Sequence, residues 1–400
     1  MTYSKESEEA IRQKGNFLAN AVCWFLGVGS LIAWSSMLAV VDYYSVLFPI
    51  NLVTSGRGGI GAFLGICMIS AVFGVADAYV QGGMIGELSF MSPDFIQSFL
   101  AGIAASGAFT SVLRLITKAS FEHADGGLRK GALMFFAIAS LFELLCVLLY
   151  AFVFPKLPIV EYYRSKAASE GSKTVSADLA AAGIQVQNTT QDVEDPRSLE
   201  RLTLSQLLMQ NWDYAMDLYL IYVLTLSIVP GFLSEDTGNH SLGSWYALVL
   251  ISMYNLLDLF GRYTPLIKCL NIESRKRLMV ATMSRFLFIP AFYFTAKLGK
   301  QGWMIMLTSL IGLTNGHLTV CVLTAAPKGY KGPEANALGN LLVLFLLGGI
   351  FSGVVLDWLW LIGKGWLQKL PKSLQLAFVC ANSRPHLASL ASLAWTHRFA

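Results

Sequence analysis

Charged residues are scarce in this chain of 400 residues. They make up 14% of it, hydrophobic residues make up 55%, and the mean hydropathy is +0.56. Because a typical soluble domain carries about 25% charged residues, this composition excludes an ordinary soluble protein. Apolar runs of about 20 residues, each long enough for a helix to cross a bilayer, predict an all-α polytopic membrane protein instead.

Motifs for enzymatic chemistry and for metal binding are also missing. The sequence has no H-E-x-x-H, no Walker loop, no G-x-S-x-G and no cluster of Cys and His. Its six cysteines are scattered without paired spacing, so we interpret them as apolar packing residues rather than as disulfide partners or metal ligands. We therefore expect no enzyme activity, no cofactor, no metal and no nucleic-acid partner.

Nine apolar runs are long enough to cross a bilayer. Four lie within residues 17–158 and five within residues 211–362, which predicts two transmembrane halves. Between them, residues 159–210 are rich in charged and small residues, so we predict a solvated cytoplasmic loop. Residues 1–16 form a cytoplasmic N-terminus and residues 363–400 a tail. The expected spans are residues 17–41, 59–83, 95–117, 128–154, 212–233, 245–267, 278–296, 303–325 and 335–362.

The basic residues predict the orientation of the chain in the membrane. With the N-terminus inside, the inner segments hold more than twice as many lysines and arginines as the outer segments before the tail. Cytoplasmic segments carry such an excess in membrane proteins. We therefore expect a cytoplasmic N-terminus and, after an odd number of spans, an outward tail.

One of the apolar runs contains charged residues in a regular pattern. Asn255, Asp258 and Arg262 lie at positions i, i+3 and i+7, so on a helix all three share one face. An ionised group at membrane depth costs roughly 2.5–3.5 kcal/mol on insertion scales. Pairing of Asp258 with Arg262 offsets part of that cost. Two interpretations remain open: a structural ion pair that holds this helix against its neighbours, or a binding site for a polar solute.

Other spans in both halves carry polar groups as well. Two helical halves with polar groups converging at mid-depth are the expected layout of an alternating-access carrier. The polar and charged residues of these other spans are Asp77, Gln81, Glu87, Gln97, Arg114, Arg285, Asn315 and Asp357.

Several motifs spread over residues 17–366 resemble the equilibrative nucleoside transporters, in particular their plant branch. Their joint occurrence is what makes the resemblance specific. They lie at residues 24–38, 81–86, 255–262, 284–290 and 314–329.

The resemblance implies a two-half helical bundle similar to the major facilitator superfamily, with eleven helices in the family. It also implies transport of purine and pyrimidine nucleosides, such as adenosine and uridine, that is either facilitative or coupled to protons. The expected partners are therefore a nucleoside, protons in the coupled case, and the lipid bilayer. We favour the plasma membrane over the vacuolar membrane as its location.

The resemblance also implies roles for five residues. Carried over by position, Trp34 would pack against the nucleoside, and Asp258 and Arg262 would bind the ribose hydroxyls. Gln97 and Asn255 would complete the substrate site. Asp258 would bind the proton if transport is proton-coupled, because a carboxylate at low dielectric can titrate near neutral pH.

The chain departs from the family pattern in three places. Ser35 stands where the family usually has Asn. The family has its second and third helices at the point where Pro49 is here followed closely by Arg57, so we count about nine spans instead of eleven. The tail after Trp366 has no counterpart that we can identify. A second interpretation therefore stays open: a truncated splice form that does not transport and acts as a membrane interaction partner.

Overall fold

The computed structural model describes residues 2–39, 60–121, 127–181, 202–229, 241–298, 301–330 and 332–369. Every regular element in these ranges is a helix, which confirms the predicted all-α polytopic class. Seven of the helices are long and apolar enough to cross a membrane. The junction at residues 40–59, where two family helices were expected to be missing, lies outside the described residues, as do residues 370–400 of the tail.

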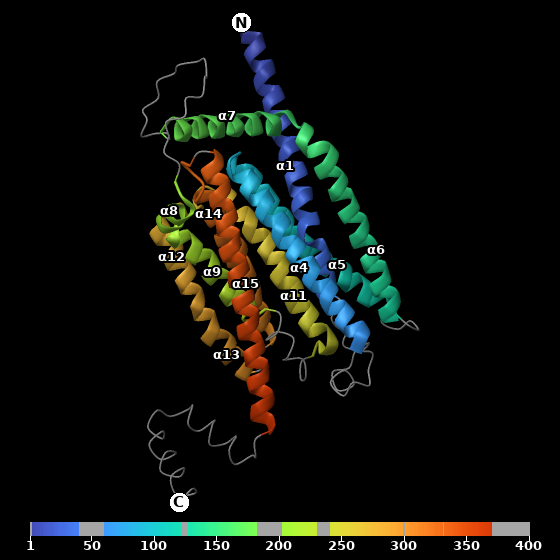
Figure 1. Cartoon of the computed structure of the whole chain (residues 1–400). Helices are drawn as coiled ribbons and strands as arrows, with labels where there is room; N and C mark the ends of the chain where they lie inside the picture. Colours follow the sequence, from blue (N-terminus) through green and yellow to red (C-terminus); the bar gives the residue numbers. More distant parts are fainter. Residues whose placement is uncertain are drawn as a thin grey trace, which may run out of the picture.

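Four long helices form the first half of the bundle. α1 (Thr2–Ala39) packs along α5 (Pro93–Phe121), and α4 (Ile60–Ser89) and α6 (Gly127–Leu148) flank this pair (Figure 1). These bounds agree with the first four predicted spans, except that α1 begins at Thr2 and extends beyond the bundle.

The second half contains five helical segments that run between the same two ends. α9 (Trp212–Leu226) and α11 (Tyr246–Tyr263) do not meet the length and composition criterion for a span, because α9 has only 15 residues and polar groups lower the hydropathy of α11. Both pack inside the bundle, so the count of about nine spans stays a prediction. The others are α12 (Arg275–Ser284) with α13 (Phe288–Leu298), α14 (Gln301–Ala325) and α15 (Gly332–Lys369).

A proline interrupts the helix formed by α12 and α13. Pro290 has no N–H to donate, and in a regular helix its ring would clash with the carbonyl group of Phe286. The chain forms a 3₁₀ turn here, η6 (Arg285–Leu287). This turn carries the buried side chain of Arg285 toward α9 and α14.

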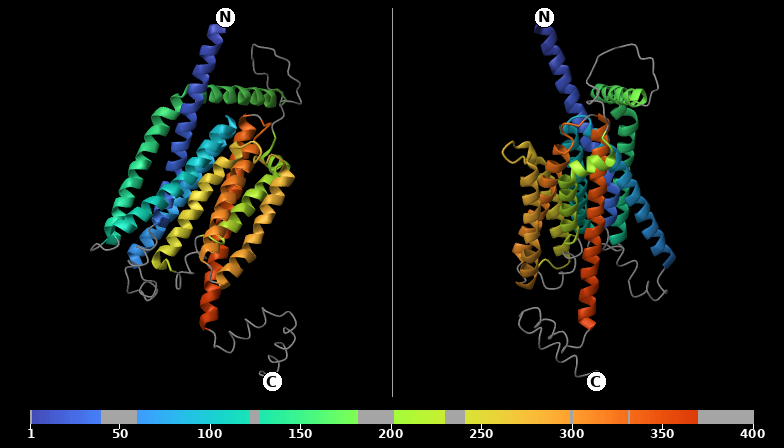
Figure 2. Two further views of the ribbon diagram at one scale, coloured as in Figure 1. Left: turned by 180° about the vertical axis from the view of Figure 1, so that it is seen from behind. Right: turned by 60° about the vertical axis from the view of Figure 1, so that its left-hand side comes forward.

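The two halves meet along two pairs of helices. α5 packs against α11, and α4 packs against α15. Gly86 of α4 and Gly339 of α15 approach closely enough that a Cβ at Gly339 would lie 3.1 Å from the Cα of Gly86. The opposite ends of α4 and α15 diverge (Figure 2), and large side chains such as Met68 and Phe351 are exposed there. The contact between α4 and α15 is therefore closed at one end of the bundle and splayed at the other.

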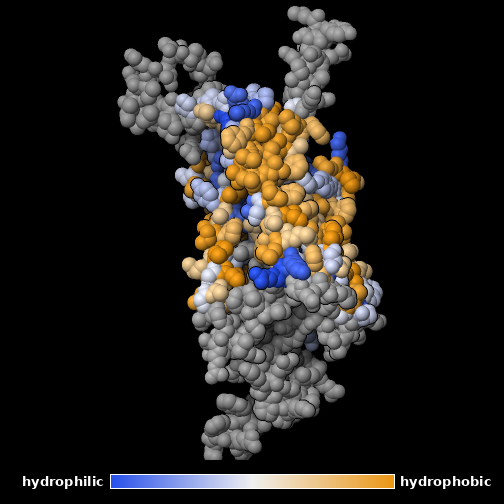
Figure 3. All heavy atoms as spheres, turned by 90° about the vertical axis from the view of Figure 1, so that its right-hand side faces the viewer, coloured by the Kyte–Doolittle hydropathy of each residue, from blue (hydrophilic) through white to orange (hydrophobic). Residues whose placement is uncertain are grey.

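The outer surface of the bundle fits a lipid environment. Figure 3 shows a face on which hydrophobic residues cover the middle and hydrophilic residues gather toward both ends. Leu133, Leu141 and Val147 of α6 are 62%, 67% and 62% exposed. A soluble monomer rarely exposes a contiguous apolar surface of this kind, whereas lipid chains solvate it.

The predicted cytoplasmic loop is partly helical. α7 (Pro158–Ala181) lies across one end of the bundle (Figure 1), and the short α8 (Leu204–Gln210) starts with a capping box at Thr203. These parts of the predicted loop are therefore helical, and its place in the cytoplasm stays a prediction. The charged and small residues that suggested a loop also suit a solvated surface helix, because Ala, Lys and Glu have high helix propensity. Arg164 of α7 is tied to Glu87 of α4 by an ion pair of 2.6 Å.

A glycine contact between α11 and α14 provides a test of this packing. A Cβ at Gly316 would collide with the carbonyl oxygen of Asp258. We expect Gly316→Ala to push α11 and α14 apart and to lower the free energy of unfolding by about 1–3 kcal/mol, as overpacking does. Thermal unfolding of the purified protein in detergent measures this. Gly65→Ala is the matched control, because nothing lies within 4 Å of a Cβ there. Equal unfolding temperatures for the two variants would contradict the close approach.

Candidate functional site

A buried ion pair on α11 forms the centre of the candidate site. Arg262 Nε donates to Asp258 Oδ2 at 3.1 Å, and the two residues are 4% and 6% exposed. They lie one helical turn apart, so α11 itself brings the two charges together. The pairing expected from the sequence is present.

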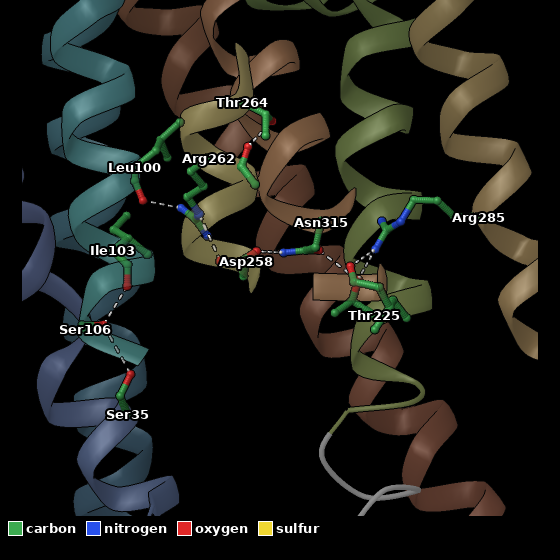
Figure 4. Close-up of polar contacts among 12 residues, drawn as sticks. Ser35, Leu100, Ile103, Ser106, Thr225, Asp258, Arg262, Thr264, Arg285 and Asn315 are labelled. Carbon is green, nitrogen blue, oxygen red and sulfur yellow. Dashed lines mark hydrogen bonds and ion pairs between the residues drawn. The ribbon is translucent and has the colours of Figure 1, made fainter. Parts of the chain in front are cut away.

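Groups from two other helices complete the ion pair. Asn315 Nδ2 of α14 donates to Asp258 Oδ1 at 2.8 Å, and Arg262 Nη1 donates to the carbonyl oxygen of Leu100 on α5 at 2.6 Å (Figure 4). Both carboxylate oxygens therefore have donors, which offsets much of the cost of burying the charge. Because α5 belongs to the first half, the bond to Leu100 links the two halves through the site.

Asn315 also connects the ion pair to a second buried cation. Its Oδ1 accepts from Thr225 Oγ1 of α9 at 2.9 Å, and Thr225 Oγ1 accepts from Arg285 Nη2 at 2.8 Å. The sequence singled out Arg285 and Asn315 as polar groups but did not connect them with Asp258. It missed Thr225, because an isolated threonine in an apolar run gives no signal of its own.

Two more of the predicted site residues lie along the interface of α5 with α11. Gln97 Nε2 donates to the backbone carbonyl oxygen of Arg262 at 3.4 Å, and Asn255 Nδ2 donates to Ser111 Oγ at 2.8 Å. Neither of these hydrogen bonds reaches the side chains of Asp258 or Arg262. Gln97 and Asn255 thus hold the two helices together on either side of the ion pair.

Trp34 occupies a different environment. It faces α4, where a Cβ at Gly74 would lie 3.9 Å from its Cζ3 atom. Among the contacts described, none joins Trp34 to the ion pair. Another tryptophan of α1 does contact α11, since Trp24 Nε1 donates to the hydroxyl of Tyr263 at 3.0 Å. The sequence motif contained Trp24, but nothing in its spacing marked it as the residue that reaches α11.

The histidine nearest the ion pair is engaged locally. His317 Nδ1 lies 2.7 Å from Thr264 Oγ1. Within the described ranges, no group of three or more His, Cys, Asp or Glu residues is placed to hold a metal ion.

Ion pairs at the end of the bundle where α7 lies are exposed to water. Arg275 Nη1 is 3.1 Å from Asp213 Oδ1, and Lys328 Nζ is 2.8 Å from Glu273 Oε1. The hydrogen bond and the positive charge of Lys328 lower the pKa of Glu273. Water screens pairs of this kind, so they stabilise the fold little. The pair of Asp258 with Arg262 differs from them by its burial.

The fold and this site together define a polytopic α-helical membrane protein with a charged centre between two groups of helices. The family model described as "Nucleoside transporter" matches residues 65–362. Equilibrative nucleotide transporter 3 of Arabidopsis thaliana is 57% identical, over 90% of this chain and 98% of the relative. Equilibrative nucleotide transporter 6 of the same plant is 56% identical, with the same coverage of both chains. The chain therefore belongs to the nucleoside transporter family, and its resemblance to the plant branch is confirmed.

The alignment with the first of these relatives is longer than the part of this chain that it covers. It has 411 positions, whereas 90% of 400 residues is about 360, so about 50 positions of the relative have no counterpart here. Two membrane helices of about 20 residues each, with their connections, have this length. This total equals the length expected for the predicted loss of two family helices, which stays a prediction.

The buried ion pair makes a prediction about stability. Arg262→Gln leaves the buried carboxylate of Asp258 without its cation, so we expect the free energy of unfolding to fall by about 3–5 kcal/mol. The double variant Asp258→Asn/Arg262→Gln removes both charges of the pair and should recover most of that loss. Thermal unfolding in detergent measures both, and Arg275→Gln serves as the control in an exposed pair. The same loss in the single and double variants would show that burial of the charge is not the cause.

Proposed function

We propose that this chain is a nucleoside transporter rather than an enzyme, and that it carries purine and pyrimidine nucleosides such as adenosine and uridine by alternating access. The observation that supports this most directly is the buried pair of Asp258 and Arg262 between α5 and α11. A carboxylate beside a guanidinium offers acceptors and donors together, which suits the neighbouring hydroxyls of a ribose. The proposed location is the plasma membrane rather than the vacuolar membrane.

Substrate binding would change the contacts between the two halves. Arg262 Nη1 donates to the carbonyl oxygen of Leu100 across the interface. A ribose hydroxyl that accepts from this nitrogen would replace that bond. A ligand shifts a conformational equilibrium only through such differences in contacts between the states. Replacement of the bond to Leu100 would therefore link binding to the relative movement of the halves.

The remaining predicted residues would complete the substrate site. Gln97 and Asn255 lie along the same interface of α5 with α11 and would border the ribose. Trp34 would supply an aromatic face for the base from α1. This role requires the base to extend from the ion pair toward the side where α1 meets α4.

Protons would act through Asp258 if transport is coupled to them. Protonation would remove the charge that Arg262 and Asn315 both contact, and so would loosen the site.

We expect Asp258→Asn to abolish any rise in uptake between pH 7.5 and pH 5.5, because the amide cannot take up a proton in this range. Initial uptake rates of the unchanged chain and the variant, at equal surface abundance, measure this. A rise that persists in Asp258→Asn would exclude Asp258 as the proton-binding group. If the uptake rate of the unchanged protein does not depend on pH, transport is facilitative.

Uptake of labelled adenosine and uridine in nucleoside-uptake-deficient cells tests the proposed function itself. We expect saturable uptake that falls at least about tenfold in Asp258→Ala, because hydrogen bonds to charged groups contribute about 1.5–3 kcal/mol. Surface abundance is quantified in the same cells. Glu273→Gln is the matched control, because it removes an exposed carboxylate far from the ion pair. Uptake that is unchanged in Asp258→Ala would place the substrate elsewhere.

A second candidate function is a truncated form that does not transport and acts as a membrane interaction partner. The gap of about 50 positions relative to the Arabidopsis protein favours it. Surface delivery without uptake, together with co-purification with a full-length family member, would support this alternative. Uptake by the chain alone would exclude it.

A further inference from the structure

A chain of hydrogen bonds runs from Arg285 to Asp258 through Thr225 and Asn315 (Figure 4). Its three links measure 2.8, 2.9 and 2.8 Å. All four residues are buried, and they come from η6, α9, α14 and α11. Four elements that are distant in sequence thus converge on the carboxylate of Asp258.

Three members of this series of hydrogen bonds, Asp258, Asn315 and Arg285, have a fixed direction. An ionised Asp258 only accepts, so Asn315 turns its NH₂ group toward it and its carbonyl oxygen toward Thr225. Thr225 Oγ1 accepts from Arg285, which can only donate, and its single hydroxyl proton has two acceptors in reach, Asn315 Oδ1 at 2.9 Å and the carbonyl oxygen of Ile221 at 2.8 Å. When this proton points to Asn315, the three hydrogen bonds run in one direction from Arg285 to Asp258. Hydrogen bonds aligned in this way between a cation and an anion polarise one another and so strengthen the chain.

Arg285 has no carboxylate in direct contact within the described part of the chain, where the ion pairs join other residues. Its further donors reach the carbonyl oxygens of Ile221 and Ile311 and the hydroxyl of Thr314. A guanidinium buried at membrane depth is costly and commonly marks a functional site. The anion to which its hydrogen bonds lead is Asp258.

We propose that Arg285 is a positioning residue for substrate recognition. Acting through Thr225 and Asn315, it holds the carboxylate of Asp258 in the orientation that receives the ribose hydroxyls. The inference rests on the proposed function, because that function assigns the ribose to Asp258. It goes further, because selectivity for the ribose diol would then depend on Arg285, Thr225 and Asn315, which do not themselves bind the ribose.

A purely structural role for the same residues would have a different signature. If Arg285 and Thr225 only locked α9 to α14, weakening the lock would lower surface abundance or impair uptake of every nucleoside equally. A positioning role acts on the ribose hydroxyls alone. It would raise the KM for uridine but not that for 2′,3′-dideoxyuridine, which lacks both hydroxyls.

Thr225→Val tests this, because it removes the hydroxyl and nearly keeps the side-chain shape. We expect the KM for uridine to rise about five- to tenfold, the loss that corresponds to one hydrogen bond. The KM for 2′,3′-dideoxyuridine should stay unchanged, and Thr225→Ser should restore the KM for uridine. Thr308→Val is the matched control, because Thr308 is equally buried and its hydroxyl bonds to the carbonyl oxygen of Met304 on its own helix.

Equal effects on the two nucleosides, or no effect on either, would overturn the positioning role. Asp258→Asn in the same assay separates this failure from failure of the proposed function. If Asp258→Asn removes the preference for uridine and Thr225→Val does not, the positioning role of Arg285 and Thr225 is wrong, whereas the proposed function stands. If Asp258→Asn leaves the preference intact, the ribose is not bound there.

A second variant covers the case in which Thr225→Val does not reach the cell surface. The exchange Asp258→Asn/Asn315→Asp keeps one carboxylate and one amide in contact but moves the anion one step closer to Arg285. We expect this protein to reach the surface and to lose the preference for uridine over 2′,3′-dideoxyuridine. A preserved preference would contradict the proposal.

Discussion

A charged side chain inside a membrane bundle needs a partner, because lipid offers none and the cost of leaving it unpaired amounts to several kcal/mol. In this protein Asp258 meets that need with two donors, Arg262 on its own helix and Asn315 on α14. The contact with Asn315 requires α11 and α14 to lie very close together. Gly316 permits this, since any side chain at that position would meet the backbone of Asp258.

An irregular helix on the other side of the site brings in a second buried cation. Pro290 breaks the regular hydrogen-bond pattern, and the resulting 3₁₀ turn directs Arg285 into the bundle. Two cations and one carboxylate thereby share one hydrogen-bonded network that spans α9, α11, α14 and η6. The bond from Arg262 to Leu100 extends the network to the first half of the chain. Movement of one half against the other would therefore alter the contacts of the charged centre.

The predicted absence of two family helices agrees with the architecture of the described residues. Two crossings fewer would leave the orientation of every later helix unchanged, and the start of α1 and the end of α15 lie at opposite ends of the bundle (Figure 1). The contact of α4 with α15 closes the end of the bundle where α7 lies, while the two helices diverge toward the other end (Figure 2). Splaying of α4 is what the loss of neighbouring helices would produce in the first half.

The sequence by itself determined the class of protein, the spacing of Asp258 and Arg262, and the family. Length and hydrophobicity suffice for the first, because a bilayer demands long apolar helices, and helical periodicity suffices for the second. Sequence patterns did not predict the helix over residues 158–181, because charged and small residues suit a surface helix as well as an extended segment. Only the tertiary structure decided that Thr225, Asn315 and Arg285 join Asp258, and that Trp24 reaches Tyr263 of α11. Such contacts depend on how helices distant in sequence rotate and approach one another, which no local pattern encodes.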